Sequence, residues 1–150
     1  MIDRVFVYGT LMRGGTYHGL VAPYVRDVQR GWVPGVLVNL GEYPGWVPGA
    51  GRVQGEVFRL RPLEPALRLL DELEDYEGPG AEGNLYERVL VRVGTPEGRT
   101  TAWAYRYVGP AGGLPVIPDG RWQGPARRGS WFRGFRPIRS IQEWKTLLSP

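Results

Sequence analysis

The stretch at residues 5–11, Val-Phe-Val-Tyr-Gly-Thr-Leu, constrains the fold of this chain more than any other segment. Its four consecutive apolar or aromatic residues predict a short strand buried on both faces, and Gly9 predicts a sharp turn at the strand's end. Glycine lets another molecule approach the backbone closely, so the N–H groups of Gly9, Thr10 and Leu11 can converge on one point. Such a point suits an anion such as a carboxylate, although turns of this kind also occur without any site.

The length of 150 residues allows a hydrophobic core without disulfides or a structural metal. Cysteine is absent, so disulfides, thiolate metal ligands and cysteine nucleophiles are excluded. The single histidine, His18, offers no zinc cluster, and we expect it to be a structural hydrogen-bonding residue. No apolar run is long enough to cross a bilayer and the N-terminus has no signal-peptide pattern, so we expect a cytoplasmic protein without a membrane partner.

The rest of the chain alternates between strand-like segments and turns rich in glycine and proline. Strands are expected within residues 31–40, 52–60, 86–93 and 100–108. Residues 16–25 are a weak helix candidate, because Gly19 and Pro23 interrupt them. Gly55 in the middle of an extended segment predicts a bulge or the close passage of another strand.

Residues 65–74 predict a helix, because Pro65 suits the first turn and good helix formers follow it. Glu74 lies about 40° from the centre of the helix's apolar face, at about 100° per residue. A carboxyl group there is partly withdrawn from water, which raises its pKa toward neutrality and suits it to take and return a proton. The alternative is that Glu74 lies at the rim of the helix and forms a salt bridge with an arginine.

Several motifs together resemble the gamma-glutamylcyclotransferase-like family, which includes gamma-glutamylamine cyclotransferases and AIG2-like proteins. Tyr-Gly-Thr-Leu at residues 8–11 resembles the family's N-terminal signature. Leu-Asp-Glu-Leu-Glu at residues 70–74 and Tyr-Glu-Arg at residues 86–88 resemble its Leu-Asp-x-x-Glu and Tyr-x-Arg patterns. Further similar segments, among them Gly-x-Tyr-Pro, lie at residues 41–44, 53–57, 102–105 and 117–122. The resemblance therefore covers a domain at about residues 1–122.

The resemblance implies an α+β fold with a mixed, six-stranded, barrel-like sheet and packed helices. It also implies a cofactor-independent lyase or acyl transferase, with no metal, that releases 5-oxoproline and a free amine from a small gamma-glutamyl substrate. Glu74 would be the catalytic acid and base. The expected substrate-binding residues are Tyr8, Gly9, Thr10, Leu11, Tyr86 and Tyr105. Tyr86 and Tyr105 could equally be core tyrosines with hydrogen-bonded hydroxyl groups.

Residues 123–150 form a basic, aromatic extension that resembles nothing in the family. The whole chain has a net charge of +4, yet Glu143 is the only acidic residue after residue 119. Basic residues alternate with aromatic ones between residues 127 and 139, a pattern that can bind single-stranded nucleic acid. We expect instead an arm that packs on its own domain or forms a homodimer contact. A capping box at Ser140 and Glu143 predicts a short helix at the end.

Two functions of other classes stay open. The domain could be a non-catalytic binder of small carboxylates, and an ordinary pKa for Glu74 would favour that interpretation. Alternatively, the chain could be a nucleic-acid-associated module that acts through its arginine-rich tail. Salt-sensitive binding to single strands that is lost on deletion of residues 123–150 would favour the second alternative.

Overall fold

The structure, a computed structural model, describes residues 1–124. The predicted homodimer contact, nucleic-acid alternative and C-terminal helix concern the extension at residues 123–150, which lies outside the described residues except for its first two. Within the described part of the chain, no helix is long and apolar enough to cross a membrane.

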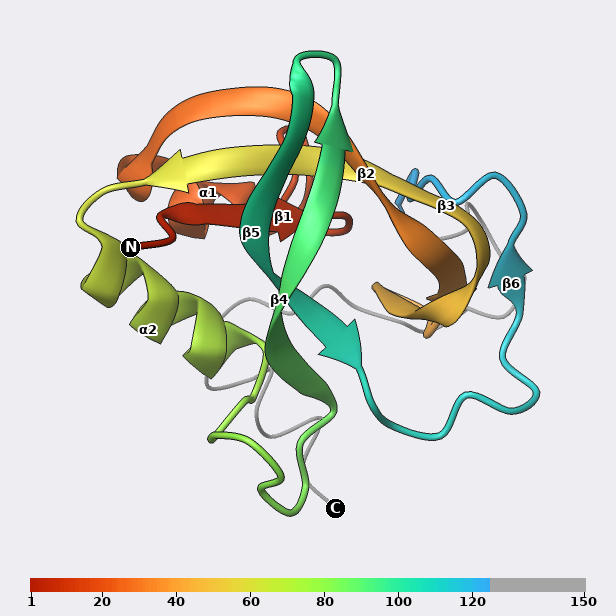
Figure 1. The fold of residues 1–150 in the computed structure, drawn as a ribbon. Helices are drawn as coiled ribbons and strands as arrows, with labels where there is room; N and C mark the ends of the chain where they lie inside the picture. Colours follow the sequence, from red (N-terminus) through yellow and green to blue (C-terminus); the bar gives the residue numbers. More distant parts are fainter. Residues whose placement is uncertain (125–150) are drawn as a thin grey trace.

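Five strands form a closed ring of hydrogen-bonded neighbours, and a sixth, short strand is attached to it (Figure 1). The strands are β1 (Arg4–Val7), β2 (Val25–Asn39), β3 (Pro44–Leu60), β4 (Tyr86–Thr95), β5 (Gly98–Tyr107) and β6 (Val116–Ile117). The order is β3-β1-β5-β4-β2-β6, and a further pairing of β2 with β3 closes the ring. The β1–β5 pair is parallel and the other pairs are antiparallel. The predicted mixed, six-stranded sheet with packed helices is confirmed, although the ring is not a regular barrel.

The first strand lies between two hydrophobic cores, as its apolar sequence predicts. Val5 and Val7 pack in a core that includes Phe58 of β3 and Leu70 of the main helix. Phe6 points the other way, into a second core inside the ring. Because β1 is buried on both faces, its position is fixed, and so is the start of the turn that follows its last residue.

The main helix, α2 (Leu63–Leu73), covers one side of the ring, away from β6 (Figure 1). It begins two residues before the predicted start, because Pro62 has an extended conformation and serves as the N-cap. Pro65 then lies in the first turn, where its missing N–H is not needed. Ala66, Leu70 and Leu73 are buried, so the helix packs through one apolar face. The weak helix candidate becomes a short α-helix, α1 (His18–Val21), followed by a 3₁₀ turn, η1 (Ala22–Tyr24).

Strands β2 and β3 are much longer than the sequence predicts. A register shift between Pro34 and Val36 places proline at an irregularity of the ladder, where a missing N–H costs little. The indole N–H of Trp46 donates a 3.0 Å hydrogen bond to the Pro34 carbonyl group and holds the two strands together there. At Gly55 an added Cβ would collide with the Val7 carbonyl group and the Phe6 ring, so the predicted close passage of another strand is confirmed.

Candidate active site

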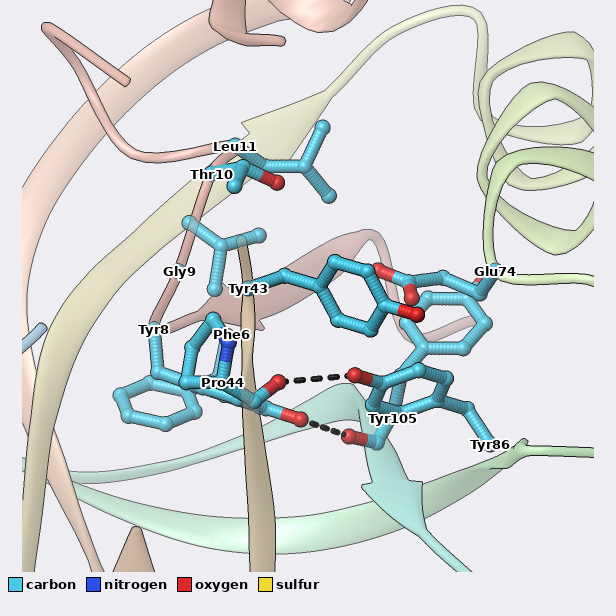
Figure 2. A pocket seen from close by; sticks show the side chains of 11 residues that line it. Phe6, Tyr8, Gly9, Thr10, Leu11, Tyr43, Pro44, Glu74, Tyr86 and Tyr105 are labelled. Carbon is cyan, nitrogen blue, oxygen red and sulfur yellow. Dashed lines mark hydrogen bonds between the residues drawn. The ribbon is translucent and has the colours of Figure 1, made fainter. Parts of the chain in front are cut away.

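A pocket opens where β1 ends, bordered by the following turn, the start of β3, the C-terminal end of α2 and strands β4 and β5 (Figure 2). The residues that line it are Phe6, Val7, Tyr8, Gly9, Thr10, Leu11, Tyr43, Pro44, Glu74, Tyr86 and Tyr105. All seven residues that the sequence analysis singles out for the site are therefore brought together around one pocket, from segments up to about a hundred residues apart. Their chemical roles remain a prediction.

In the turn at residues 9–11, the carbonyl groups accept hydrogen bonds, whereas the N–H groups have no hydrogen-bond partner among residues 1–124. The three carbonyl oxygens accept hydrogen bonds from Met12 N–H (3.1 Å), Tyr17 N–H (2.9 Å) and His18 Nδ1 (2.9 Å). Within residues 1–124 the hydrogen bonds at this turn do not use the N–H groups of Gly9, Thr10 and Leu11 as donors. Unpaired backbone donors beside a pocket can bind an anion. His18 fills the structural role that the sequence predicts.

Two pocket tyrosines are fixed by hydrogen bonds to the backbone of neighbouring segments. The Tyr8 hydroxyl group donates to the Tyr105 carbonyl oxygen at 2.6 Å and accepts from Trp46 N–H at 3.3 Å. The Tyr86 hydroxyl group donates to the Pro44 carbonyl oxygen at 2.8 Å (Figure 2). Tyr86 is thus both a core tyrosine with a bonded hydroxyl group and part of the pocket wall, so the two interpretations of this residue are compatible.

Tyr105 links the pocket wall to a charged pair on the outside of α2. Its hydroxyl group donates a 2.6 Å hydrogen bond to Asp71 Oδ1, and Arg88 Nε lies 3.4 Å from the same oxygen. The Arg88 guanidinium group stacks over the Trp103 ring, 4.7 Å from its centre. Burial raises the pKa of Asp71, while the Tyr105 hydrogen bond and the Arg88 charge act in the opposite direction. The sequence places Asp71 on the polar side of the helix and gives no sign of these partners.

Glu74 is the C-cap of α2, and its side chain extends from the end of the helix into the pocket (Figure 2). Its N–H still bonds to the Leu70 carbonyl group at 2.9 Å, so the helical path predicted for it is kept. Burial raises the pKa of Glu74 from 4.5 to about 8, and no cation among residues 1–124 offsets it. The ion pairs within the same residues involve Asp3, Glu56, Asp71 and Glu87 rather than Glu74.

Phenol groups surround the Glu74 carboxyl group. Burial raises the pKa of Tyr8, Tyr86 and Tyr105 well above 10 and that of Tyr43 to about 12, and the Glu74 charge adds to each shift. Figure 2 shows the Tyr43 ring reaching across the pocket with its hydroxyl group toward Glu74. The phenols therefore stay neutral near pH 7, and Glu74 is the group of the pocket that titrates closest to neutrality.

Four lining residues lie outside the seven expected site residues. Tyr43 and Pro44 belong to the Gly-x-Tyr-Pro segment, which resembles the family's pattern and was the available signal for them. Phe6 and Val7 precede the signature turn and look like ordinary strand residues. Among residues 1–124 there is no group of three or more acidic or histidine side chains placed to hold a metal ion.

Known proteins resemble this chain over most of its length. A family model described as gamma-glutamyl cyclotransferase, AIG2-like, matches residues 5–124. The gamma-L-glutamyl-butirosin B gamma-glutamyl cyclotransferase of Niallia circulans is 35% identical over 107 residues, which are 71% of this chain and 67% of that protein. The gamma-glutamylcyclotransferase family protein YtfP of Escherichia coli K12 is 38% identical over 121 residues, which cover 79% and 95% of the two chains.

Among solved structures, an AIG2-like protein from Mus musculus matches with a TM-score of 0.64 and 27% sequence identity. The match covers 85% of this chain and 99% of the mouse protein. Its extent indicates that the two proteins share a fold over nearly the whole of the mouse chain.

Proposed function

Because the chain belongs to the gamma-glutamyl cyclotransferase, AIG2-like family, we propose that it is an enzyme that releases 5-oxoproline from a gamma-glutamyl amine or peptide. In this reaction the substrate's own α-amino group attacks its side-chain carbonyl carbon. A carbon–nitrogen bond forms as the five-membered ring closes, the bond to the leaving amine breaks, and water is not consumed. The coproduct is a free amine.

The observation that carries the proposal is the position of Glu74, whose carboxyl group extends from the end of α2 into the pocket without a paired cation among the described residues. Its carboxyl group lies in the pocket and its pKa of about 8 is close to neutrality. A carboxyl group tuned in this way can both take a proton and return it in one catalytic cycle. An ordinary surface glutamate is almost fully ionised at pH 7, so it rarely holds a proton that it could donate.

In the proposed mechanism Glu74 moves one proton between two nitrogen atoms. As a carboxylate it takes a proton from the substrate's α-ammonium group, which frees the amine to attack. It then gives that proton to the departing nitrogen as the tetrahedral intermediate collapses. The attacking nitrogen also loses a second proton to become the lactam N–H, and the released amine takes that proton and leaves as an ammonium ion. The positive α-ammonium group favours the carboxylate form of Glu74 when substrate binds, because an opposite charge lowers the pKa of a carboxyl group.

The turn at residues 9–11 is proposed to bind the substrate's α-carboxylate group. Its N–H groups are unpaired within the described residues, and the turn lines the same pocket as Glu74. Holding the carboxylate fixes the attached α-carbon, and with it the α-amino group, beside Glu74. Ring closure gains strongly from such positioning, because both reacting atoms belong to one bound molecule.

The test is to measure 5-oxoproline release from a panel of gamma-glutamyl amines, gamma-glutamyl dipeptides and glutathione. Glu74→Gln keeps the shape of the side chain and removes the transferable proton, so turnover should fall by about 10²- to 10⁴-fold. Turnover that survives in this variant would contradict the role of Glu74. Failure of the correctly folded wild type on the whole panel would favour the alternative of a non-catalytic carboxylate binder.

A further inference from the structure

The side chain of Glu56 connects β3 to the turn that follows β1. Glu56 pairs with Val7 across the β1–β3 ladder, and Val7 is the last residue of β1. Its Oε1 accepts a 2.8 Å hydrogen bond from the backbone N–H of Arg13. Its Oε2 accepts a second bond from Arg13 Nε at 3.0 Å and lies 3.0 Å from Arg13 Nη2. One carboxylate thus binds both the backbone and the guanidinium group of the same residue.

Among the ion pairs of residues 1–124, this pair is set apart by its carboxylate. The Glu56 side chain is 14% exposed and both of its oxygens are used, whereas the Arg13 side chain is 59% exposed. The Asp3–Arg4 pair, by contrast, has one contact of 3.4 Å between side chains that are 37% and 40% exposed. Charge-assisted, bidentate bonds to a shielded carboxylate are stronger and geometrically more specific than exposed pairs. The Glu56 contact is therefore suited to fixing the position of the backbone at Arg13.

The turn at residues 9–11 is anchored on both sides. Before it, the Tyr8 hydroxyl group bonds to the Tyr105 carbonyl oxygen of β5 at 2.6 Å. After it, Arg13 bonds to Glu56 of β3. The Met12 N–H bond to the Gly9 carbonyl group, at 3.1 Å, closes the turn between these two anchors. The N–H groups of the turn, which have no partner in the described part of the chain, therefore lie on a short segment tied to two different strands.

The Glu56 contact also bears on what Arg13 can do. Arg13 is the cation nearest in sequence to the turn, yet it borders a second cavity together with Glu56 and is not among the residues that line the pocket of Glu74. Its Nε and Nη2 atoms are instead held by Glu56. Carboxylate binding is left to the backbone donors, whose directions depend on the conformation of the turn.

We propose that Glu56 is a positioning residue, which acts through Arg13 to keep the turn at residues 9–11 in the conformation that binds the substrate's α-carboxylate group. The inference rests on the proposed function for the identity of the anion. Preorganised donors bind an anion without a cost for ordering the loop. Loss of the Glu56–Arg13 contact should therefore weaken substrate binding more than it slows the proton transfer at Glu74.

The test compares full-length wild type, Glu56→Gln and Arg13→Ala, with Asp3→Asn as the matched control that breaks an exposed carboxylate–arginine pair. For Glu56→Gln, KM for the best substrate and Kd for 5-oxoproline should rise about tenfold, with kcat within about twofold of wild type. Arg13→Ala keeps its backbone N–H and should show a smaller rise. Asp3→Asn should match wild type. An unchanged KM and Kd in Glu56→Gln, with only a lower Tm, would overturn the proposal.

A second measurement needs no substrate and separates the two proposals. Backbone ¹⁵N relaxation should give lower order parameters for Gly9, Thr10 and Leu11 in unliganded Glu56→Gln than in wild type or Asp3→Asn. Order parameters that do not change would overturn the positioning role of Glu56, even if the enzyme is active. If the wild type neither turns over substrates nor binds 5-oxoproline, the proposed function and the carboxylate part of this inference both fail, whatever the order parameters show.

Discussion

The hydroxyl group of Tyr105 donates a 2.6 Å hydrogen bond to Asp71, and this contact joins β5 to α2 at the wall of the pocket. Asp71 lies three residues before Glu74, so the bond fixes the end of the helix from which the proposed catalytic group extends. Arg88 contacts the same carboxylate from β4. Three elements of the fold therefore converge one helical turn away from Glu74.

Replacing Tyr105 with phenylalanine should lower the free energy of unfolding by about 1–3 kcal/mol, because a half-buried carboxylate loses a hydrogen-bond donor. Urea denaturation of Tyr105→Phe, Asp71→Asn and the double variant would measure the effect. The double variant should be more stable than the sum of the two single losses predicts, since both changes act on the same bond: Tyr105→Phe removes its donor, and Asp71→Asn replaces its charged acceptor with a neutral one. Simple additivity would show that the contact contributes little to stability.

The pH dependence of kcat/KM should report the protonation of Glu74 in the free enzyme. The carboxylate is the form that accepts a proton, and its pKa is raised to about 8. Below that pH, kcat/KM should therefore fall about tenfold for each unit of pH. Initial rates between pH 5 and 9 on a substrate with a stable amide would test this. A profile that stays flat from pH 9 down to pH 5 would indicate that the pKa of Glu74 is not raised.

The same shift predicts how Glu74→Gln changes stability with pH. A carboxyl group whose pKa rises from 4.5 to about 8 on folding destabilises the folded state increasingly as pH rises through that window. Glutamine does not titrate, so the variant should gain stability over wild type between pH 5 and 8. The gain should reach at most about 5 kcal/mol, at about 1.4 kcal/mol per unit. Thermal or urea unfolding at several pH values would measure it, and a constant difference would refute the shift.

Gly9→Ala should disturb the pocket more than it disturbs the rest of the fold. An added Cβ would lie 2.8 Å from the ring of Pro44, whose carbonyl group holds the Tyr86 hydroxyl group. Relieving the overlap should cost about 1–3 kcal/mol in stability and reduce kcat/KM. Gly19→Ala is the matched control, because no atom lies within 4 Å of its added Cβ. Full activity in Gly9→Ala would show that the turn tolerates displacement.

The parts of the fold that the sequence predicts well are those with local signals. Four apolar residues and a glycine predict the first strand, and an apolar stripe predicts the main helix. The two long strands, β2 and β3, were underestimated because glycines and prolines interrupt their pattern. Gly35, with a φ of +146°, and Pro34 lie at a register shift in β2. The ladder on both sides of that shift forms through pairing partners that no local pattern reveals.

The pocket shows the same division between local and distant information. The signature turn and Glu74 could be found from spacing and from the family's motifs. The hydroxyl partner of Tyr8 is the carbonyl group of a residue ninety-seven positions away, and such a contact depends on the order of the strands. The aromatic lining by Tyr43 likewise depends on where β3 begins. The raised pKa values follow from this assembly, since they are caused by burial among residues from separate elements.

The parallel pairing of β1 with β5 bears on how the protein is made. β5 lies between β1 and β4, so the ring stays open until the last of its strands has been synthesised. During translation, β1 leaves the ribosome before the other strands. One of its edges stays unpaired until β5, almost a hundred residues later in the chain, has been synthesised. Nascent chains that stall before Gly98 would expose that edge of β1, and chaperones that bind exposed strands could bind it. Activity should appear only after the ring has closed, because Tyr105 completes the pocket wall.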